Sequence, residues 1–195
     1  MRRLGPALAA LLLAGAGSAG AADANGRFAM KGAGFLPCQV LTTEREKRSD
    51  LYFLIAGWVE GYLTAHNRHA ADTFDIASFE STELLLQVMG SHCKDHPGDR
   101  LYPVLNSMLG QLQADRLVKE SERVEITEGE RKTLLYLETV RRLQAELQRR
   151  GLYKGEIDGR FSEACRAALQ AFQSDVELEM TGFPDQLTLW KLFRK

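Results

Sequence analysis

The chain has 195 residues, of which 45% are hydrophobic, and its formal net charge at pH 7 is −1. This length allows one or two domains, and this apolar content is enough to bury a core. Basic and acidic residues nearly balance, at 25 and 26, so the sequence gives no electrostatic case for a nucleic-acid partner, which needs a basic face.

The first 22 residues have the pattern of a secretion signal. Arg2 and Arg3 form a positive start, residues 7–14 are apolar, and the small residues that follow end in an A-x-A form. A membrane anchor is the alternative, but the Leu-rich part covers only about ten residues, roughly half of a bilayer span. We expect cleavage after Ala21 or Ala22, a net charge of −3 once both arginines are removed, and a periplasmic protein without a membrane span.

Residues 23–115 predict a helical bundle that follows an extended, Gly- and Ala-rich lead-in over 23–37. Helices are expected over 51–66, with Ser49 or Asp50 as cap, over 81–93, and from about Leu101 after a Pro-Gly break. The first helix carries an apolar stripe at helical spacing, expected to face the core: Leu51, Leu54, Trp58, Tyr62 and Ala65. Beside it, Gly57 and Gly61 are expected to allow close approach of another helix.

Residues 116–138 form a charge-rich segment that we interpret as a linker. Thr127 and Glu130 can form a capping box. A helix opened there could run from Glu128 to Arg150 without a break, which would make the connection semi-rigid. We recognise no internal repeat in the chain.

Residues 139–195 predict three short helices joined by glycine-containing turns. Val140, Leu143 and Leu147 share one face of a helix that ends at Gly151. Ser162 and Asp185 can cap the second and third helices. Their apolar faces carry Cys165, Ala168, Leu169 and Phe172, and then Leu189, Trp190, Leu192 and Phe193.

These helices and turns contain an ordered set of motif residues: Leu143-Gln144, Gly151, Tyr153, Gly155, Asp158-Gly159, Phe161, Phe172-Gln173, Thr181-Gly182, Asp185 and Thr188. With them, the segment resembles the three-helix peptidoglycan-binding domain found beside many bacterial cell-wall enzymes. Two positions depart from the family pattern, since Ser162 stands where glycine is usual and Cys165 where threonine is usual. The resemblance implies a small helical module that binds peptidoglycan.

The expected ligand is a glycan that carries a short peptide, and it offers amides, hydroxyls and carboxylates to loop side chains. The candidate ligand-binding residues lie in loops or at helix starts: Tyr153, Asp158, Arg160, Asp185 and Thr188. We expect the two segments that hold them to form a shallow polar cleft, with Arg160 binding a carboxylate. The alternative is a local structural role for each, in which Asp158 shapes a turn, Asp185 caps a helix and Tyr153 fills the core. Phe161, Phe172 and Trp190 are assigned to the core.

Three cysteines become disulfide candidates if the chain is exported. We pair Cys38 with Cys93, because both lie in the middle region and Cys165 belongs to the terminal module. Such a bond should stabilise the fold by about 4 kcal/mol. Cys165 is then expected to be a buried, inert thiol, and a reactive free thiol is the alternative.

The middle region holds three short motifs: Phe35-Leu36-x-Cys38, Gly57-Trp58-x-x-Gly61-Tyr62 and Cys93-x-x-His96-Pro97. With them, it is similar to the Rap/Tai kind of type VI secretion immunity protein and, more distantly, to acid-stress chaperones of the HdeA kind. The resemblance implies a non-catalytic periplasmic domain that binds a protein partner or effector.

No catalytic or metal-binding constellation is predicted. His92-Cys93-x-x-His96 offers metal ligands only superficially, because an oxidised Cys93 cannot bind as a thiolate. Glu60 lies near Trp58, yet about 200° round the helix from it, so an apolar pocket that would make it a catalytic acid is not expected. No nucleophile elbow, zinc-protease motif or phosphate loop is present in the sequence.

The sequence thus predicts an all-α protein in which a disulfide-tied helical bundle precedes a three-helix peptidoglycan-binding module. The expected function is non-enzymatic attachment to peptidoglycan, with the bundle binding a protein partner, and no cofactor is expected. An immunity-like or chaperone-like protein localised to the wall is one alternative. A cell-wall hydrolase with an unrecognised site is the other.

Overall fold

The computed structural model describes residues 22–23 and 25–194, so the predicted signal segment lies almost wholly outside the described residues. The chain divides into a unit that ends at Met30 and a unit that spans Lys31–Lys195. In the first unit, the Asp23 carboxylate accepts hydrogen bonds from the backbone N–H groups of Asn25 and Arg27, at 2.9 and 2.8 Å. No helix of the described residues is both long enough and apolar enough to cross a membrane.

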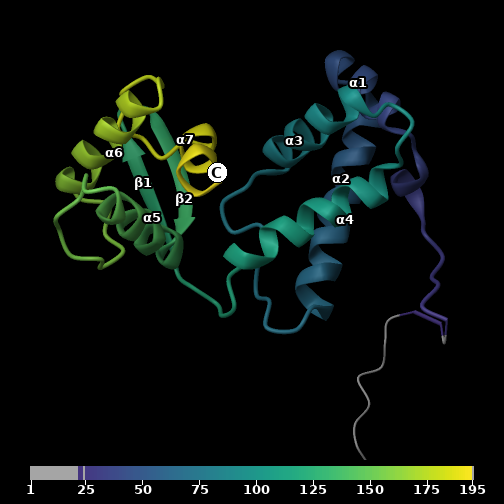
Figure 1. Ribbon diagram of the computed structural model, residues 1–195, viewed down its shortest axis with the longest axis horizontal. Coiled ribbons are helices and arrows are strands. Elements are labelled where there is room, and N and C mark those ends of the chain that lie inside the picture. Colours follow the sequence, from purple (N-terminus) through teal and green to yellow (C-terminus); the bar gives the residue numbers. More distant parts are fainter. Residues whose placement is uncertain (1–21, 24, 195) are drawn as a thin grey trace, which may run out of the picture. The chain divides into compact units, whose positions relative to one another are not determined.

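The second unit opens with a short 3-10 helix, η1 (Gly32–Phe35), and a bundle of four α-helices (Figure 1). These are α1 (Cys38–Lys47), α2 (Asp50–His69), α3 (Thr82–Asp95) and α4 (Leu101–Leu112), and a second 3-10 turn, η2 (Gln113–Asp115), extends the last of them. Three of the four helices match the predicted ones. The side chains of Ser49 and Ser81 cap α2 and α3 by accepting the backbone N–H groups of Tyr52 and Leu84, both at 3.2 Å. Helix α1 was not predicted.

Helix α2 buries a different face from the predicted one. Tyr52, Ile55 and Val59 are in the core, whereas Leu51 is 36% exposed and Leu54 55% exposed. Of the predicted stripe, Trp58 and Tyr62 are half-buried and pack against the core, whereas the prediction was wrong for Leu51, Leu54 and the exposed Ala65. Helix α2 is apolar on most of its circumference, so periodicity alone does not choose the buried side. The predicted packing role of the two glycines of α2 was also wrong, because a Cβ added at either would meet no atom of the described chain within 4 Å.

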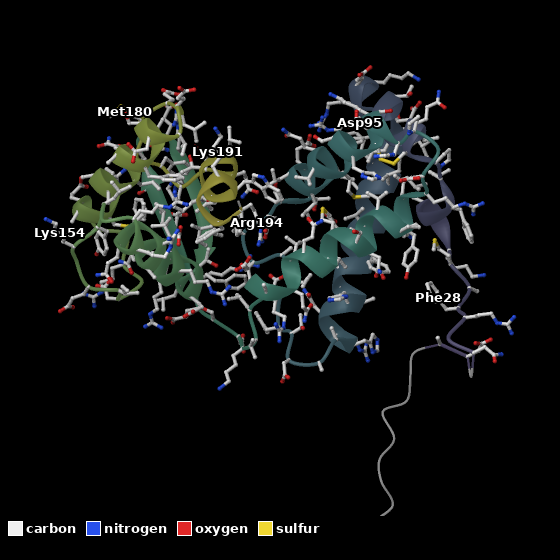
Figure 2. All side chains as sticks on the ribbon, in the orientation of Figure 1. Phe28, Asp95, Lys154, Met180, Lys191 and Arg194 are labelled. Atoms are coloured by element: carbon white, nitrogen blue, oxygen red, sulfur yellow. A yellow bond between two sulfur atoms is a disulfide. The ribbon has the colours of Figure 1, made fainter. Side chains whose placement is uncertain are left out.

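A disulfide joins the start of α1 to α3. Cys38 and Cys93 are bonded, with their Cα atoms 4.8 Å apart, and Figure 2 shows the bond inside the bundle. Both cysteines are buried among apolar side chains of all four bundle helices. The predicted pairing is therefore confirmed in the structure, and Cys165 is free and buried.

The segment predicted as a linker or helix contains a β-hairpin. Strands β1 (Arg123–Glu128) and β2 (Arg131–Tyr136) pair in antiparallel register, and Gly129, with φ of 56°, occupies the first position of the two-residue turn. The prediction of a continuous helix from Glu128 was wrong, and so was the strictly all-α class: the described fold is mostly helical with one two-stranded sheet. The hairpin forms because Ile126 and Leu135 can be buried in a second hydrophobic core.

Three helices complete the chain, as predicted: α5 (Leu137–Arg149), α6 (Glu163–Asp175) and α7 (Gln186–Phe193). Ser162 caps α6 by accepting Cys165 N–H at 3.3 Å, and Asp185 caps α7 by accepting Thr188 N–H at 2.8 Å. We call α5, α6, α7 and their loops the C-terminal module. Its core contains the predicted apolar residues Val140, Leu143, Leu147, Cys165, Ala168, Leu169, Phe172, Leu189 and Leu192.

The second core also receives side chains from the first turn of α3 and from the segment that leads into it. Phe79 and Leu84 pack into it, and the Gln186 amide donates to Phe79 C=O and accepts Ser81 N–H, both at 2.7 Å. Arg194 forms ion pairs with Asp115 and with Glu80, whose side chain is 1% exposed. Burial raises the pKa of Glu80, and the Arg194 guanidinium partly offsets that effect.

Candidate functional site

Gln144 of α5 organises the loop between α5 and α6. This fully buried side chain accepts Gly159 N–H at 2.8 Å and donates to the Asp158 carboxylate and to Arg160 C=O, both at 3.0 Å. Gly159 has φ of 83°, and a Cβ there would lie 2.8 Å from the side chain of Leu137. The loop therefore needs glycine at position 159, for its positive φ, and glutamine at position 144, for three hydrogen bonds. We call such a buried glutamine, bonded to a loop backbone, a glutamine clamp.

Gln173 of α6 holds the loop between α6 and α7 in the same way. Its carbonyl oxygen accepts Gly182 N–H at 2.7 Å. Its amide nitrogen lies within hydrogen-bond distance of Phe183 C=O, at 3.2 Å, and of the Thr188 hydroxyl, at 3.0 Å. Gly182 also has a positive φ, of 66°.

The two glutamine clamps form an internal repeat that the sequence analysis missed. Each unit has a buried glutamine, then a glycine with positive φ, then a capping residue three positions after that glycine, and then a helix. The signal in the sequence is the pair of strings Leu-Gln…Asp-Gly-Arg-Phe-Ser and Phe-Gln…Thr-Gly-Phe-Pro-Asp. The different loop lengths between glutamine and glycine conceal it.

Four of the five candidate ligand-binding residues make internal hydrogen bonds. Tyr153 is buried, and its hydroxyl donates to Glu156 C=O at 3.0 Å. Asp158 accepts Arg160 N–H at 2.8 Å as well as the Gln144 amide. Asp185 caps α7, and the buried Thr188 hydroxyl meets Gln173. These contacts are local structural roles, which are the alternative to ligand binding given for these residues in the sequence analysis.

The structure gathers the candidate residues into two groups. Tyr153, Asp158 and Arg160 lie around Gln144, whereas Asp185 and Thr188 lie around Gln173. The groove beside Arg160, described next, is lined by neither Asp185 nor Thr188. A single polar cleft that contains all five residues therefore remains a prediction.

Arg160 lies at a groove of about 530 Å³ between the first loop of the module and strand β1. One wall is Gly159, Arg160 and Phe161, with Leu137 and Arg166 beside it, and the other is the four consecutive strand residues Val124, Glu125, Ile126 and Thr127. The strand wall lies outside the motif from which the peptidoglycan-binding module was predicted, so no motif residue pointed to it.

The groove is lined by three charged side chains, of which Glu125 pairs with Lys132 at 3.6 Å. Arg166 pairs with Glu128 and, at 3.4 Å, with Glu163. The exposed Arg160 guanidinium makes no hydrogen bond or ion pair with any residue the structure describes. The backbone N–H of Arg160, followed by the Gln144 amide, holds the pKa of Asp158 below its usual value, and the Arg160 charge adds to this effect. The ionised Asp158 carboxylate reduces the positive potential at Arg160, but the guanidinium keeps its own hydrogen-bond donors for an anionic ligand.

The bundle residues discussed as a catalytic acid or as metal ligands make contacts that are common on protein surfaces. Glu60 is exposed and accepts a hydrogen bond from the Thr82 hydroxyl at 2.8 Å. His92 contacts Asp99 at 2.8 Å and stacks on His96. Among the described residues there is no group of three or more His, Cys, Asp or Glu side chains able to hold a metal ion.

Comparison with known families gives one match, which covers the C-terminal module. Residues 137–192 match the family described as a putative peptidoglycan binding domain, a span that runs from the start of α5 almost to the end of α7. The predicted resemblance of the terminal segment is thereby confirmed, and the two resemblances suggested for the bundle find no support. No curated protein and no solved structure matches the chain.

Proposed function

We propose that this chain is an exported, non-enzymatic protein that attaches to peptidoglycan through its C-terminal module. The observation that carries the proposal is the family match over residues 137–192, on a segment whose three helices and two glutamine clamps are complete. Domains of this family are typically non-catalytic, and peptidoglycan binding places the protein at the cell wall. Export rests on the N-terminal pattern and is supported by the Cys38–Cys93 bond.

Binding to intact cell walls tests the proposal directly. The mature full-length protein should co-sediment with purified sacculi in a saturable manner, and it should not co-sediment with cellulose particles, which present neither N-acetylated sugars nor peptides. Equal recovery with both materials, or no recovery with sacculi, contradicts peptidoglycan binding.

Absence of catalysis is part of the same proposal. Purified protein incubated with sacculi should release no soluble muropeptides, with or without added divalent metal. Release that is abolished by Glu60→Gln would instead establish the hydrolase alternative, with Glu60 as the acid.

The bundle is proposed to bind a protein partner, and the outer face of α2 supports this. Phe53 and Leu54 are 52% and 55% exposed there, and the space beside Gly57 and Gly61 is open. Neighbouring exposed apolar side chains of this kind support contact with a protein partner. An immunity-like or chaperone-like protein held at the wall would use the same surface.

Affinity capture from a periplasmic extract tests the partner surface. A protein retained by the wild type should be lost with Phe53→Glu/Leu54→Glu. Leu134→Glu serves as the matched control, because Leu134 is 58% exposed on the hairpin. Retention of the same protein by the α2 variant contradicts this role of α2.

A further inference from the structure

The outer edge of strand β1 is an unpaired strand edge. The described sheet has two strands, and β2 pairs with only one side of β1. Leu137 N–H donates to Glu122 C=O at 2.8 Å, so residues 122 and 137 form a hydrogen-bonded pair just beyond the ladder. Such pairs recur at every second residue of an antiparallel ladder. The backbone groups of Val124, Ile126 and Glu128 therefore point to β2.

Because only every second residue of β1 bonds to β2, the backbone N–H and C=O groups of Glu125 and Thr127 are directed away from β2. None of these groups has a hydrogen-bond partner among the described residues. Both residues are exposed, so water satisfies these groups in the absence of a ligand. They are free to pair with an added strand.

The groove beside Arg160 runs along this edge. Side chains of successive strand residues point to opposite faces of a sheet. A groove lined by four consecutive residues, Val124 to Thr127, therefore follows the edge of the strand and does not lie on one face. No residue of β2 lines it, so the edge in question is the one that faces away from β2.

The length of the groove and the Arg160 guanidinium fit a short peptide that carries a carboxylate. Four strand residues span about 13 Å, which is the length of a peptide of roughly four residues in extended form. Opposite the strand edge, Arg160 supplies a guanidinium that can hold a carboxylate with two parallel hydrogen bonds. The other arginine of the groove is already paired with Glu128.

We propose that the edge of β1 and Arg160 together bind an extended, carboxylate-bearing peptide, which adds a third strand to the hairpin. This inference rests on the proposed function, because the peptide available to a wall-bound protein is the short acidic peptide of peptidoglycan. It assigns part of the ligand site to the hairpin, which lies outside the family match. It also makes the peptide, and not the glycan, the recognised group.

Two pairs of matched variants test the two contacts separately. Arg160→Ala removes the guanidinium, and Arg131→Ala removes an exposed arginine of β2 that does not line the groove. Thr127→Pro removes an outward N–H from the β1 edge. Leu134→Pro removes an outward N–H from the opposite edge without a change of charge, because Leu134 faces Glu125 in the ladder and is exposed.

The probe is the soluble tetrapeptide released from sacculi by an amidase, titrated calorimetrically into the full-length mature protein. Arg160→Ala should weaken its binding at least tenfold, and Thr127→Pro about fivefold. Arg131→Ala and Leu134→Pro should each stay within about twofold of the wild type.

The outcomes separate this inference from the proposed function. If the wild-type protein sediments with sacculi but does not bind the tetrapeptide, the peptide groove is wrong and wall attachment stands. The same holds if Arg160→Ala binds the tetrapeptide as well as the wild type does. Equal losses for Thr127→Pro and Leu134→Pro overturn the strand addition, since both then act by loosening the hairpin. If the wild type binds neither sacculi nor tetrapeptide, both proposals fail.

Discussion

Gln144 and Gln173 are among the few polar side chains that are completely buried in the structure. A buried amide costs free energy unless it is hydrogen-bonded. Each of these two uses its carbonyl oxygen and its amide nitrogen to hold a loop backbone. Their role is therefore to shape the loops on which ligand-binding residues such as Arg160 are placed.

Replacement of Gln144 should destabilise the fold strongly. Gln144→Ala leaves the Gly159 N–H without its acceptor and opens a cavity in the core, so we expect the free energy of unfolding to fall by about 2–4 kcal/mol. Urea denaturation followed by circular dichroism measures this. Gln148→Ala is the control, since Gln148 lies one turn further along α5, is exposed, and should cost less than about 0.5 kcal/mol. Similar losses for the two variants would show that the clamp contributes little.

The Cys165 thiol should be inert while the protein is folded. Burial raises the pKa of Cys165 to about 12, so almost no thiolate forms at pH 8, and a thiol reagent such as DTNB should react only after denaturation. A raised pKa in the folded state means that the unfolded state loses its proton first. The contribution of Cys165 to stability is therefore complete below pH 9 and is lost as the pH rises from about 9 to about 12. Cys165→Ala should remove this part of the loss of stability at alkaline pH. Rapid labelling of the Cys165 thiol by DTNB in the native protein would contradict its burial.

At the scale of elements, helix positions could be predicted because their start signals are local. Ser49, Ser81, Ser162 and Asp185 each precede an apolar helical pattern, and each caps a helix in the structure. The hairpin could not be predicted in the same way. Its apolar–polar alternation is short, with only Val124 and Ile126 as apolar members of β1, and it lies in a charge-rich segment. Strand formation also depends on burial against a core that belongs to distant parts of the chain.

The candidate site was predictable only in part. Arg160 could be chosen because its loop carries the motif. Whether the other candidate residues are available to a ligand depends on hydrogen bonds that the sequence does not reveal. Asp158 and Thr188 are bonded to glutamines that lie 14 and 15 residues earlier in the chain. The β1 wall of the groove is brought next to the loop by folding alone.

Amide hydrogen exchange should show the alternation along β1. The N–H groups of Val124, Ile126 and Glu128 point to β2 and should exchange slowly, whereas those of Glu125 and Thr127 should exchange at least tenfold faster because they face solvent. Exchange measured by NMR at individual residues tests this order. Uniform protection of all five amides would mean that the outer edge is covered by another part of the chain.

At the scale of the whole molecule, Arg194 joins the end of α7 to residues far away in the sequence. Its ion pair with Glu80 is almost fully buried, and Asp115 provides a second partner. Removal of one member of a buried pair leaves an uncompensated charge, whereas replacement of both by apolar side chains of similar size is often tolerated.

Arg194→Ala should therefore cost about 3–5 kcal/mol of the free energy of unfolding, more than the double variant Glu80→Leu/Arg194→Met. Denaturant titrations of the wild type, both single variants and the double variant give the coupling energy. A double variant that loses as much as the sum of the single ones would show that the two residues act independently.

The repeated glutamine clamp bears on the ancestry of the C-terminal module. The two glutamines are separated by 29 positions, and chains below about 40 residues rarely bury enough apolar surface to fold alone. If the two units descend from one, the ancestral unit could have been stable only as a symmetric dimer, with each copy covering the apolar face of the other. Fusion of the two genes would then have made folding independent of protein concentration, and it would have freed one of the two loops to diverge.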